Sequence, residues 1–352
     1  MVLPDEFTRI PDALIRFHKR THPPDIVDAA GAPVVDAALH RQGVTFYSEF
    51  VDRRAPVTAD HLAGNWLFAG DYWTHFGHFL FESLARLWAY PALRDQIDGV
   101  VFLDPRGSGV VSDDRFQRQL LNLLGVDLPV RLLAASTTID RLIVPRAGCG
   151  MGPLSPGIPA FRRFIQGALR QVPARTDADR VYISRSGYGL RRGGILGEDH
   201  LETALAAEGY LIWSPEAATL EDQIATYLGA RQIIGPDSSA LHLFGFLGTS
   251  AQDLAIVLRR PDGARDMLPQ ITGFTGRAPL IIDAIVQMRL RDNARTPAWA
   301  QVAELDFARL SQGLAAAGFV SSADAIPALT RRKTRMLWEK AARRMKCSFA
   351  DA

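Results

Sequence analysis

The sequence lacks the features that define several common protein classes. Its two cysteines, Cys149 and Cys347, lie far apart in 352 residues, so it has neither a disulfide framework nor a cysteine cluster with metal-ligand spacing. It has no uncharged apolar run of the ~20 residues that a membrane span needs. Its N-terminus lacks the basic and apolar regions of a signal peptide. We therefore expect a cytoplasmic protein.

A strong excess of charge of either sign is absent as well. Lysine and arginine total 40, aspartate and glutamate total 38, and the formal net charge is +2. This balance gives no electrostatic reason to expect nucleic acid as a partner. A hydrophobic fraction of 47% over this length is enough for two domains with separate cores.

The second half of the chain contains a regular alternation of strand and helix patterns. Short runs rich in β-branched residues alternate with segments whose apolar residues recur at helical spacing. The alternation predicts an α/β fold with a parallel, doubly wound sheet and functional loops at the carboxyl ends of its strands. The expected strands are 181–186, 209–213, 231–234 and 254–258, and the expected helices begin at 198, 220 and 240.

The first half shows a similar rhythm, and the polar stretch 173–180 separates the two halves. There we predict strands at 44–51, 99–103, 131–134 and 141–145, and helices at 114–124 and 161–172. Helical patterns also cover 281–290 and 306–317 near the C-terminus. The predicted domains are residues 1–175, residues 176–300, and C-terminal helices in residues 301–352.

Residues 74–88 read as one helix, with Thr74 at its N-cap position and an apolar stripe on one face. Four polar residues spaced by three, four and four line up on another face. Two imidazoles and a carboxylate in one row form a candidate for proton transfer, whereas the plainer alternative is a solvated face with an ion pair. The spacing is not the His-Glu-x-x-His pattern of a zinc site, so no metal is predicted. The row consists of His75, His78, Glu82 and Arg86.

Arg185 in the predicted strand 181–186 and the two arginines of the Gly-rich loop that follows it are suited to an anion. A strand-to-helix turn with two serines follows the strand 231–234, and its helix N-terminus can offer N–H groups to a phosphate. The alternatives are an ion pair of Arg185 with Glu198 or Asp199, and an Asp237 that only caps a helix. The loop arginines are Arg191 and Arg192, and the turn contains Asp237, Ser238 and Ser239.

Several short motifs in one order resemble glycosyltransferase family 61. They are 78–84 in the first half, 181–185 with an arginine in the next loop, Glu198 at a helix start, 209–210, 221–223 and 233–236. The resemblance covers roughly residues 64–260. It implies two Rossmann-like domains facing across a cleft (the GT-B arrangement), with donor bound by the second domain and acceptor by the first.

The resemblance also implies an inverting, metal-independent transferase without a cofactor. Its expected donor is a nucleotide-sugar, most simply a UDP-sugar, and its acceptor a glycan or glycolipid in surface polysaccharide synthesis. Glu82 is the expected base, with His78 second and Asp71 third. The expected donor contacts are Arg185, Arg191, Arg192, Glu216, Asp237, Ser238 and Ser239, and the expected acceptor contacts are the aromatic Trp73 and His75.

The chain departs from the family at two positions. Asp237 stands where members usually have a histidine, and a carboxylate there repels a diphosphate unless it is turned away or caps the helix. The strand 254–258 does not end in the usual glutamate, and Glu216 or Asp253 are the candidate replacements for its ribose contact. The leading alternative is therefore a catalytically inert relative that binds a nucleotide or glycan. A Rossmann oxidoreductase lacks support because no Gly-x-Gly-x-x-Gly follows a strand.

The tail 331–346 has eight basic residues and one acidic residue. Apolar residues along one edge, including Met336 and Trp338, make it an amphipathic helix suited to an anionic membrane at the inner face of the cell. The alternative is a terminal helix that packs on the first domain.

Overall fold

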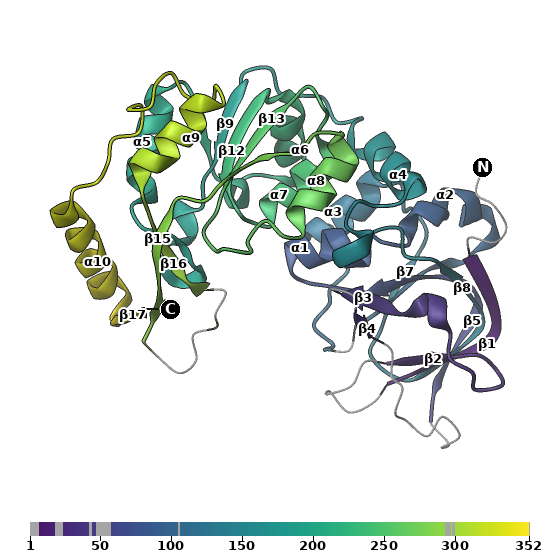
Figure 1. Cartoon of the computed structure of the whole chain (residues 1–352). Coiled ribbons are helices and arrows are strands. Elements are labelled where there is room, and N and C mark those ends of the chain that lie inside the picture. The colour runs from purple at the N-terminus through teal and green to yellow at the C-terminus, as the bar shows by residue number, and fades with distance from the viewer. Residues whose placement is uncertain are drawn as a thin grey trace. The chain divides into compact units, whose positions relative to one another are not determined.

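The computed structural model describes residues 7–17, 24–41, 44–46, 58–104, 106–292, 297 and 300–351. The chain forms two compact units, Met1–Gln171 and Val172–Ala352. Both contain sheets together with helices, which confirms the predicted mixed α/β class (Figure 1). Among the described residues, no helix is both long enough and apolar enough to cross a membrane.

The first unit contains a six-stranded mixed sheet in the order β2-β1-β8-β5-β6-β7. Strands β8, β5, β6 and β7 run parallel, whereas β1 is antiparallel to both β8 and β2. Strands near three of the predicted positions are confirmed, whereas β1 and β5 were not predicted. The bounds are β1 Phe7–Arg16, β2 Asp25–Val27, β5 Asp60–Asp71, β6 Gly99–Leu103, β7 Val130–Leu133 and β8 Thr137–Pro145.

A separate hairpin of the first unit pairs β3 (Leu39–Arg41) with β4 (Val44–Phe46). The strand expected at 44–51 is thus confirmed over its first three residues, and the rest of it lies outside the described residues. Helices α3 (Phe116–Leu123) and α4 (Pro159–Leu169) lie within or close to the predicted ranges, and α4 begins with proline at its first position.

The single helix expected at 74–88 is wrong. The segment instead breaks into short helical pieces, and Thr74 lies before them without capping them. Pro91, just beyond the expected helix, has no N–H to continue a helix, and a new helix starts there with proline in its first turn. The pieces are α1 Phe76–His78, the π-helical turn η3 Phe79–Ser83, the 3₁₀ turns η4 Leu87–Ala89 and η5 Arg94–Gln96, and α2 Tyr90–Leu93 between them.

The second unit is built on a five-stranded, fully parallel sheet in the order β11-β9-β12-β13-β14. In chain order this is the 2-1-3-4-5 arrangement of a doubly wound sheet, whose direction of winding reverses between β9 and β12. The strands are β9 Arg180–Ile183, β11 Leu211–Trp213, β12 Gln232–Pro236, β13 Asp253–Val257 and β14 Leu280–Ile282, and the helices are α5 Glu198–Ala207, α6 Leu220–Gly229, α7 Ala240–Leu247 and α8 Met267–Thr275.

A second sheet of this unit contains β10, β16, β15 and β17, in that order. The helix expected at 281–290 is wrong, because this stretch is divided between β14 and β15. Asp283 makes the turn between them by accepting the N–H of Ile285 at 3.0 Å, and β-branched isoleucines on both sides favour strands. The bounds are β10 Gly194–Ile195, β15 Ile285–Arg291, β16 Val302–Leu305 and β17 Phe349–Asp351.

Two C-terminal helices complete the unit. Helix α9 (Phe307–Ala316) is capped by Asp306, and α10 (Arg331–Met345) is capped by Thr330. The apolar edge of α10 packs on the second sheet: Trp338 is buried, donates its Nε1 hydrogen to Glu304 at 2.7 Å and stacks edge-on with Phe349. The helix therefore belongs to Val172–Ala352, and its tryptophan faces protein.

Candidate functional site

Three loops of the second unit converge at the carboxyl edge of its parallel sheet. Arg185 lies two residues after β9, Asp237 follows β12, and Arg259 lies two residues after β13. Because β9, β12 and β13 are neighbours in the sheet, these side chains share one edge. The reversal of winding between β9 and β12 makes this edge the usual position of a ligand crevice.

Asp237 is turned toward two arginines and is fully buried. Its carboxylate accepts the backbone N–H of Arg259 at 2.5 Å and two guanidinium N–H groups of Arg260 at 2.9 and 3.1 Å. Arg259 in turn donates to the carbonyl oxygen of Asp237 at 2.5 and 3.1 Å. One negative charge is therefore matched by two positive charges, and the carboxylate does not face a ligand unneutralised.

Arg259 keeps its charge although it is only 4% exposed. Burial lowers the pKa of its guanidinium to about 10; the carboxylate of Asp237 opposes that shift, and the positive charges of Arg185 and Arg260 add to it. A pKa of about 10 leaves the group protonated at neutral pH. The charges of Arg185 and Arg260 thus lie close enough to Arg259 to lower its pKa.

Several buried polar atoms at this edge have no partner within the described part of the chain. They are Nε of Arg185, Oγ of Ser238 and Nη1 of Arg259. Buried donors are normally satisfied, so unpaired ones indicate a ligand or water. All three can donate to phosphate oxygens. Ser239, at the N-cap of α7, is half-buried next to them.

Glu198 holds the arginine loop through the backbone. Its carboxylate accepts the N–H of Arg185 at 2.8 Å and the hydroxyl of Tyr182 at 3.1 Å. The alternative in which Glu198 neutralises the guanidinium of Arg185 is wrong, because in the described residues that group makes no ion pair and lies over the ring of Tyr188 at 5.2 Å. Burial raises the pKa of Glu198 to about 7, despite the opposing hydrogen bonds.

The remaining donor-site candidates lie around the same loop. The guanidinium group of Arg192 also lies over the ring of Tyr188, with its carbon 5.7 Å from the ring centre. Arg191 is exposed. Glu216 follows β11, and its carboxylate packs so closely on Gly187 that a Cβ there would lie 2.6 Å from it. Asp253 begins β13, so it lies at the opposite edge of the sheet, which makes it unsuitable as a ribose contact.

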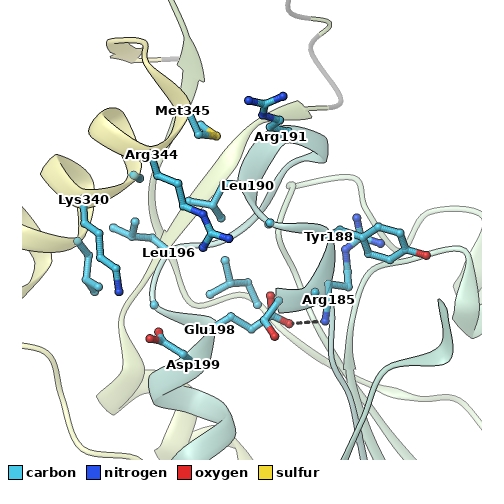
Figure 2. A pocket seen from close by; sticks show the side chains of 18 residues that line it. Arg185, Tyr188, Leu190, Arg191, Leu196, Glu198, Asp199, Lys340, Arg344 and Met345 are labelled. Atoms are coloured by element: carbon cyan, nitrogen blue, oxygen red, sulfur yellow. Dashed lines mark hydrogen bonds between the residues drawn. The ribbon is translucent and has the colours of Figure 1, made fainter. Parts of the chain in front are cut away.

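A pocket of about 420 Å³ opens beside this loop. One wall runs from Arg185 to Asp199, and the other is one side of α10 (Figure 2). Arg344 points into the pocket toward Glu198, and Lys340 reaches down from α10 on the side of Asp199. The pocket therefore combines cations from two segments with two carboxylates and an apolar lining.

The proton-transfer candidates lie in the first unit. Nδ1 of His78 is 3.5 Å from Oε1 of Glu82, whose side chain is 1% exposed, and the His78 side chain is 31% exposed. The rings of Trp73 and His75 each have centres 5.1 Å from that of His78, so both expected acceptor contacts flank the pair. Arg106 lies over the ring of Trp73, with its guanidinium carbon 5.5 Å from the ring centre.

Arg86 does not belong to this row, contrary to expectation. It is fully buried and donates to the carbonyl oxygens of Asp36 and Ala38, both at 2.8 Å. Burial lowers the pKa of its guanidinium to about 10, and the charge of Asp71 opposes that shift. Asp71 ends β5, and its carbonyl oxygen accepts the Ser83 hydroxyl at 2.6 Å. Asp71 therefore supports the buried arginine.

Arg259 and Arg260 are the residues that the sequence reading missed. The signal was a pair of arginines directly after a buried apolar strand, the same arrangement that singled out Arg185. In the described residues, no group of three or more histidine, cysteine, aspartate or glutamate side chains could hold a metal ion.

Comparison with protein families gives one result that bears on this site. A family model described as Glycosyltransferase 61 matches residues 76–252, just over half of the chain. The match includes His78, Glu82, Arg185, Asp237 and Ser238 and ends before β13 and the arginine pair. Among curated proteins, none matches the chain.

We predict that Glu198→Gln changes the pH dependence of stability. The pKa of about 7 in the folded chain lies above the ordinary 4.5. The stability that protonated Glu198 contributes is therefore fully present below about pH 4.5 and is lost as the pH rises through 7. Glutamine has no charge to bury. Between pH 5 and pH 8 the variant should therefore gain about 2 to 3 kcal/mol of unfolding free energy relative to wild type, measured by urea unfolding. The exposed control Glu221→Gln should show no such trend, and a pH-independent difference for Glu198→Gln would contradict the prediction.

Proposed function

The chain belongs to glycosyltransferase family 61 and is a glycosyltransferase with a sugar donor and an acceptor, and from this premise we propose an inverting, metal-independent reaction with a nucleotide-sugar. The proposed donor is a UDP-sugar, and the proposed acceptor is a glycan or glycolipid in surface polysaccharide synthesis. We also propose the GT-B arrangement, with the donor bound by Val172–Ala352 and the acceptor by Met1–Gln171.

The observation that supports this proposal is the arginine cluster, formed by Arg185, Arg259 and Arg260 at the sheet edge where the winding reverses. Arg185, Arg259 and Arg260 bring three positive charges to one sheet edge, and Asp237 brings one negative charge. Glu198, whose carboxylate accepts the backbone N–H of Arg185, adds a second acidic group, and the cluster keeps a net positive charge that suits the diphosphate leaving during transfer. A metal-independent transferase has to stabilise this leaving group with protein cations and N–H groups, and guanidinium groups do so through paired hydrogen bonds.

The group transfer itself needs one base. The oxygen of an acceptor hydroxyl forms a bond to the anomeric carbon, the bond from that carbon to the diphosphate oxygen breaks, and its electron pair leaves with the diphosphate. The hydroxyl proton passes to the base, which we assign to Glu82. His78, 3.5 Å from that carboxylate, orients it or takes the proton onward. Trp73 and His75 offer ring faces against which an acceptor sugar can pack.

We propose further that the outer face of α10 binds the inner surface of an anionic membrane. Arg332, Arg335 and Arg343 are exposed, and Met336 is 56% exposed, whereas Trp338 is buried against the sheet. The attraction is therefore electrostatic for the most part, at about 1 kcal/mol for each basic residue near the surface.

The diphosphate role of the arginine cluster predicts the effect of Arg260→Ala. The affinity for UDP should fall by about tenfold to a hundredfold, because a charged hydrogen bond of about 1.5 to 3 kcal/mol is lost. The affinity for uridine should stay unchanged. Isothermal titration calorimetry measures both. The control is Arg265→Ala, whose side chain is 63% exposed and pairs with Asp262. Equal losses for UDP and uridine would indicate a structural role only.

The role of Glu82 as base predicts that Glu82→Gln transfers sugar about 10²- to 10⁴-fold more slowly than wild type. The amide keeps the shape of the side chain but accepts no proton, so UDP affinity should remain near that of wild type. Turnover of the nucleotide-sugar and UDP titration measure the two effects. Glu221→Gln, on an exposed turn of α6, is the control. A Glu82→Gln rate close to wild type would rule the carboxylate out as the base.

Membrane binding predicts that Arg332→Gln/Arg335→Gln binds vesicles of mixed phosphatidylglycerol and phosphatidylcholine about tenfold or more weakly than wild type. Flotation of the full chain with these vesicles measures the effect, and pure phosphatidylcholine vesicles should bind neither protein. Arg115→Gln/Arg163→Gln removes two exposed arginines of the first unit as the matched control. Unchanged vesicle binding by the α10 variant would end the membrane proposal.

A further inference from the structure

Helix α10 contributes one face to the pocket beside the arginine loop. The residues on that face are spaced by three, one, three and one, which is the spacing of one side of an α-helix. The helix lies beyond residues 76–252, so the family match does not account for its cations. The pocket-lining residues of α10 are Leu337, Lys340, Ala341, Arg344 and Met345.

The orientation of α10 is fixed by packing. Trp338 and Ala341 are buried against the second sheet, and the Trp338 indole donates to Glu304. Gly197, between β10 and α5, lets the helix come close, because a Cβ at that position would lie 3.0 Å from Cδ1 of Leu337. Lys340 and Arg344 are therefore held over the pocket by their own helix.

The charges of the pocket favour an anion. Arg185 and Arg191 lie on the loop wall, and Lys340 and Arg344 lie on the helix wall. Within the described residues, neither Lys340 nor Arg344 makes an ion pair or a side-chain hydrogen bond. Cations that face a pocket without a protein partner are available to a ligand. Glu198 and Asp199 lie opposite and can accept hydrogen bonds from hydroxyl groups.

The pocket shares residues with the sheet edge that contains Asp237 and Arg259. Arg185 lines the pocket and also acts electrostatically on Arg259, which lies at the end of β13. Glu198 also lines the pocket and also acts electrostatically on Arg259. A volume of about 420 Å³ lies in the range of small-molecule sites. Leu190 and Leu196 provide apolar surface for a base or a sugar face.

We propose that α10 is a wall of the donor site, in which Lys340 and Arg344 bind the phosphate groups of a nucleoside diphosphate opposite Arg185. This inference rests on the proposed function, in which the donor diphosphate lies at the arginine cluster. Two cations from the helix add to those of the loops, and they stabilise the charge that grows on the diphosphate as its bond to the sugar breaks. The pocket-facing cations of α10 thus serve the donor, and its outward cations do not.

The test compares two pairs of substitutions on the same helix. Lys340→Ala/Arg344→Ala should bind UDP about tenfold to a hundredfold more weakly than wild type in isothermal titration calorimetry, with uridine affinity unchanged. Arg332→Ala/Arg335→Ala removes two outward cations and should bind UDP as wild type does. Lys340→Arg/Arg344→Lys keeps both charges and should restore most of the affinity, which separates loss of charge from displacement of the helix.

The outcomes distinguish this inference from the proposed function. Wild-type UDP affinity in Lys340→Ala/Arg344→Ala, together with weakened binding in Arg260→Ala, would overturn the role of α10 and leave the donor proposal standing. Equal weakening in the inward and outward pairs would overturn it as well, because the effect would then follow net charge alone. A wild-type chain that binds no UDP would overturn both.

Discussion

The pairing of Asp237 with Arg259 and Arg260 is the interaction on which the proposed donor site depends. A buried, unpaired carboxylate at the end of β12 would repel a diphosphate and would itself be costly to desolvate. Both problems are solved by arginines from the end of β13, the neighbouring strand. Breaking such a buried pair typically costs about 3 to 5 kcal/mol, because the remaining charge loses its partner. Gly263 packs against the Asp237 carboxylate, where a side chain would collide. The cluster thus joins two strand ends and sets the sign of the charge there.

Three strands of the parallel sheet, β9, β11 and β12, were predictable because each is followed by a helix pattern, whereas β14 was missed because it lies in the stretch that reads as a helix. The parallel direction of β9, β12 and β13 then follows from the rules of doubly wound sheets. By contrast, β15 pairs with β16 and β17, which lie farther along the chain, and no local pattern reveals such partners. The isoleucines around 281–285 fit both a helical and an extended reading. Distant pairing decided between them, as it did for β1, which pairs with β8.

The candidate site was predictable where a residue follows a strand and hidden where the outcome depends on burial. Arg185 and Asp237 could be placed at a sheet edge from the sequence, because they come directly after strands. The fate of Arg86 could not, since its spacing from Glu82 fits an ion pair, whereas the fold buries its guanidinium on two backbone carbonyls. Gly70 allows that burial: a Cβ there would lie 3.2 Å from Nη1 of Arg86. Sequence spacing predicts which face of a helix a side chain lies on. It does not identify the groups that the side chain contacts in the folded chain.

Helix α10 has basic residues on two faces, one directed into the pocket and one directed outward. Trp338 anchors the helix to β16 and β17, and β16 pairs with β10, which leads directly into the pocket floor at Leu196 and Gly197. The position of Lys340 and Arg344 is therefore coupled to the second sheet and through it to the loop that contains Arg185. Leu190 of that loop and Leu196 after β10 pack in one apolar cluster with Trp338 and Ala341, so α10 contacts the loop directly. Helix α10, which lies outside the family match, thus helps to shape the loop of Arg185, which lies inside the match.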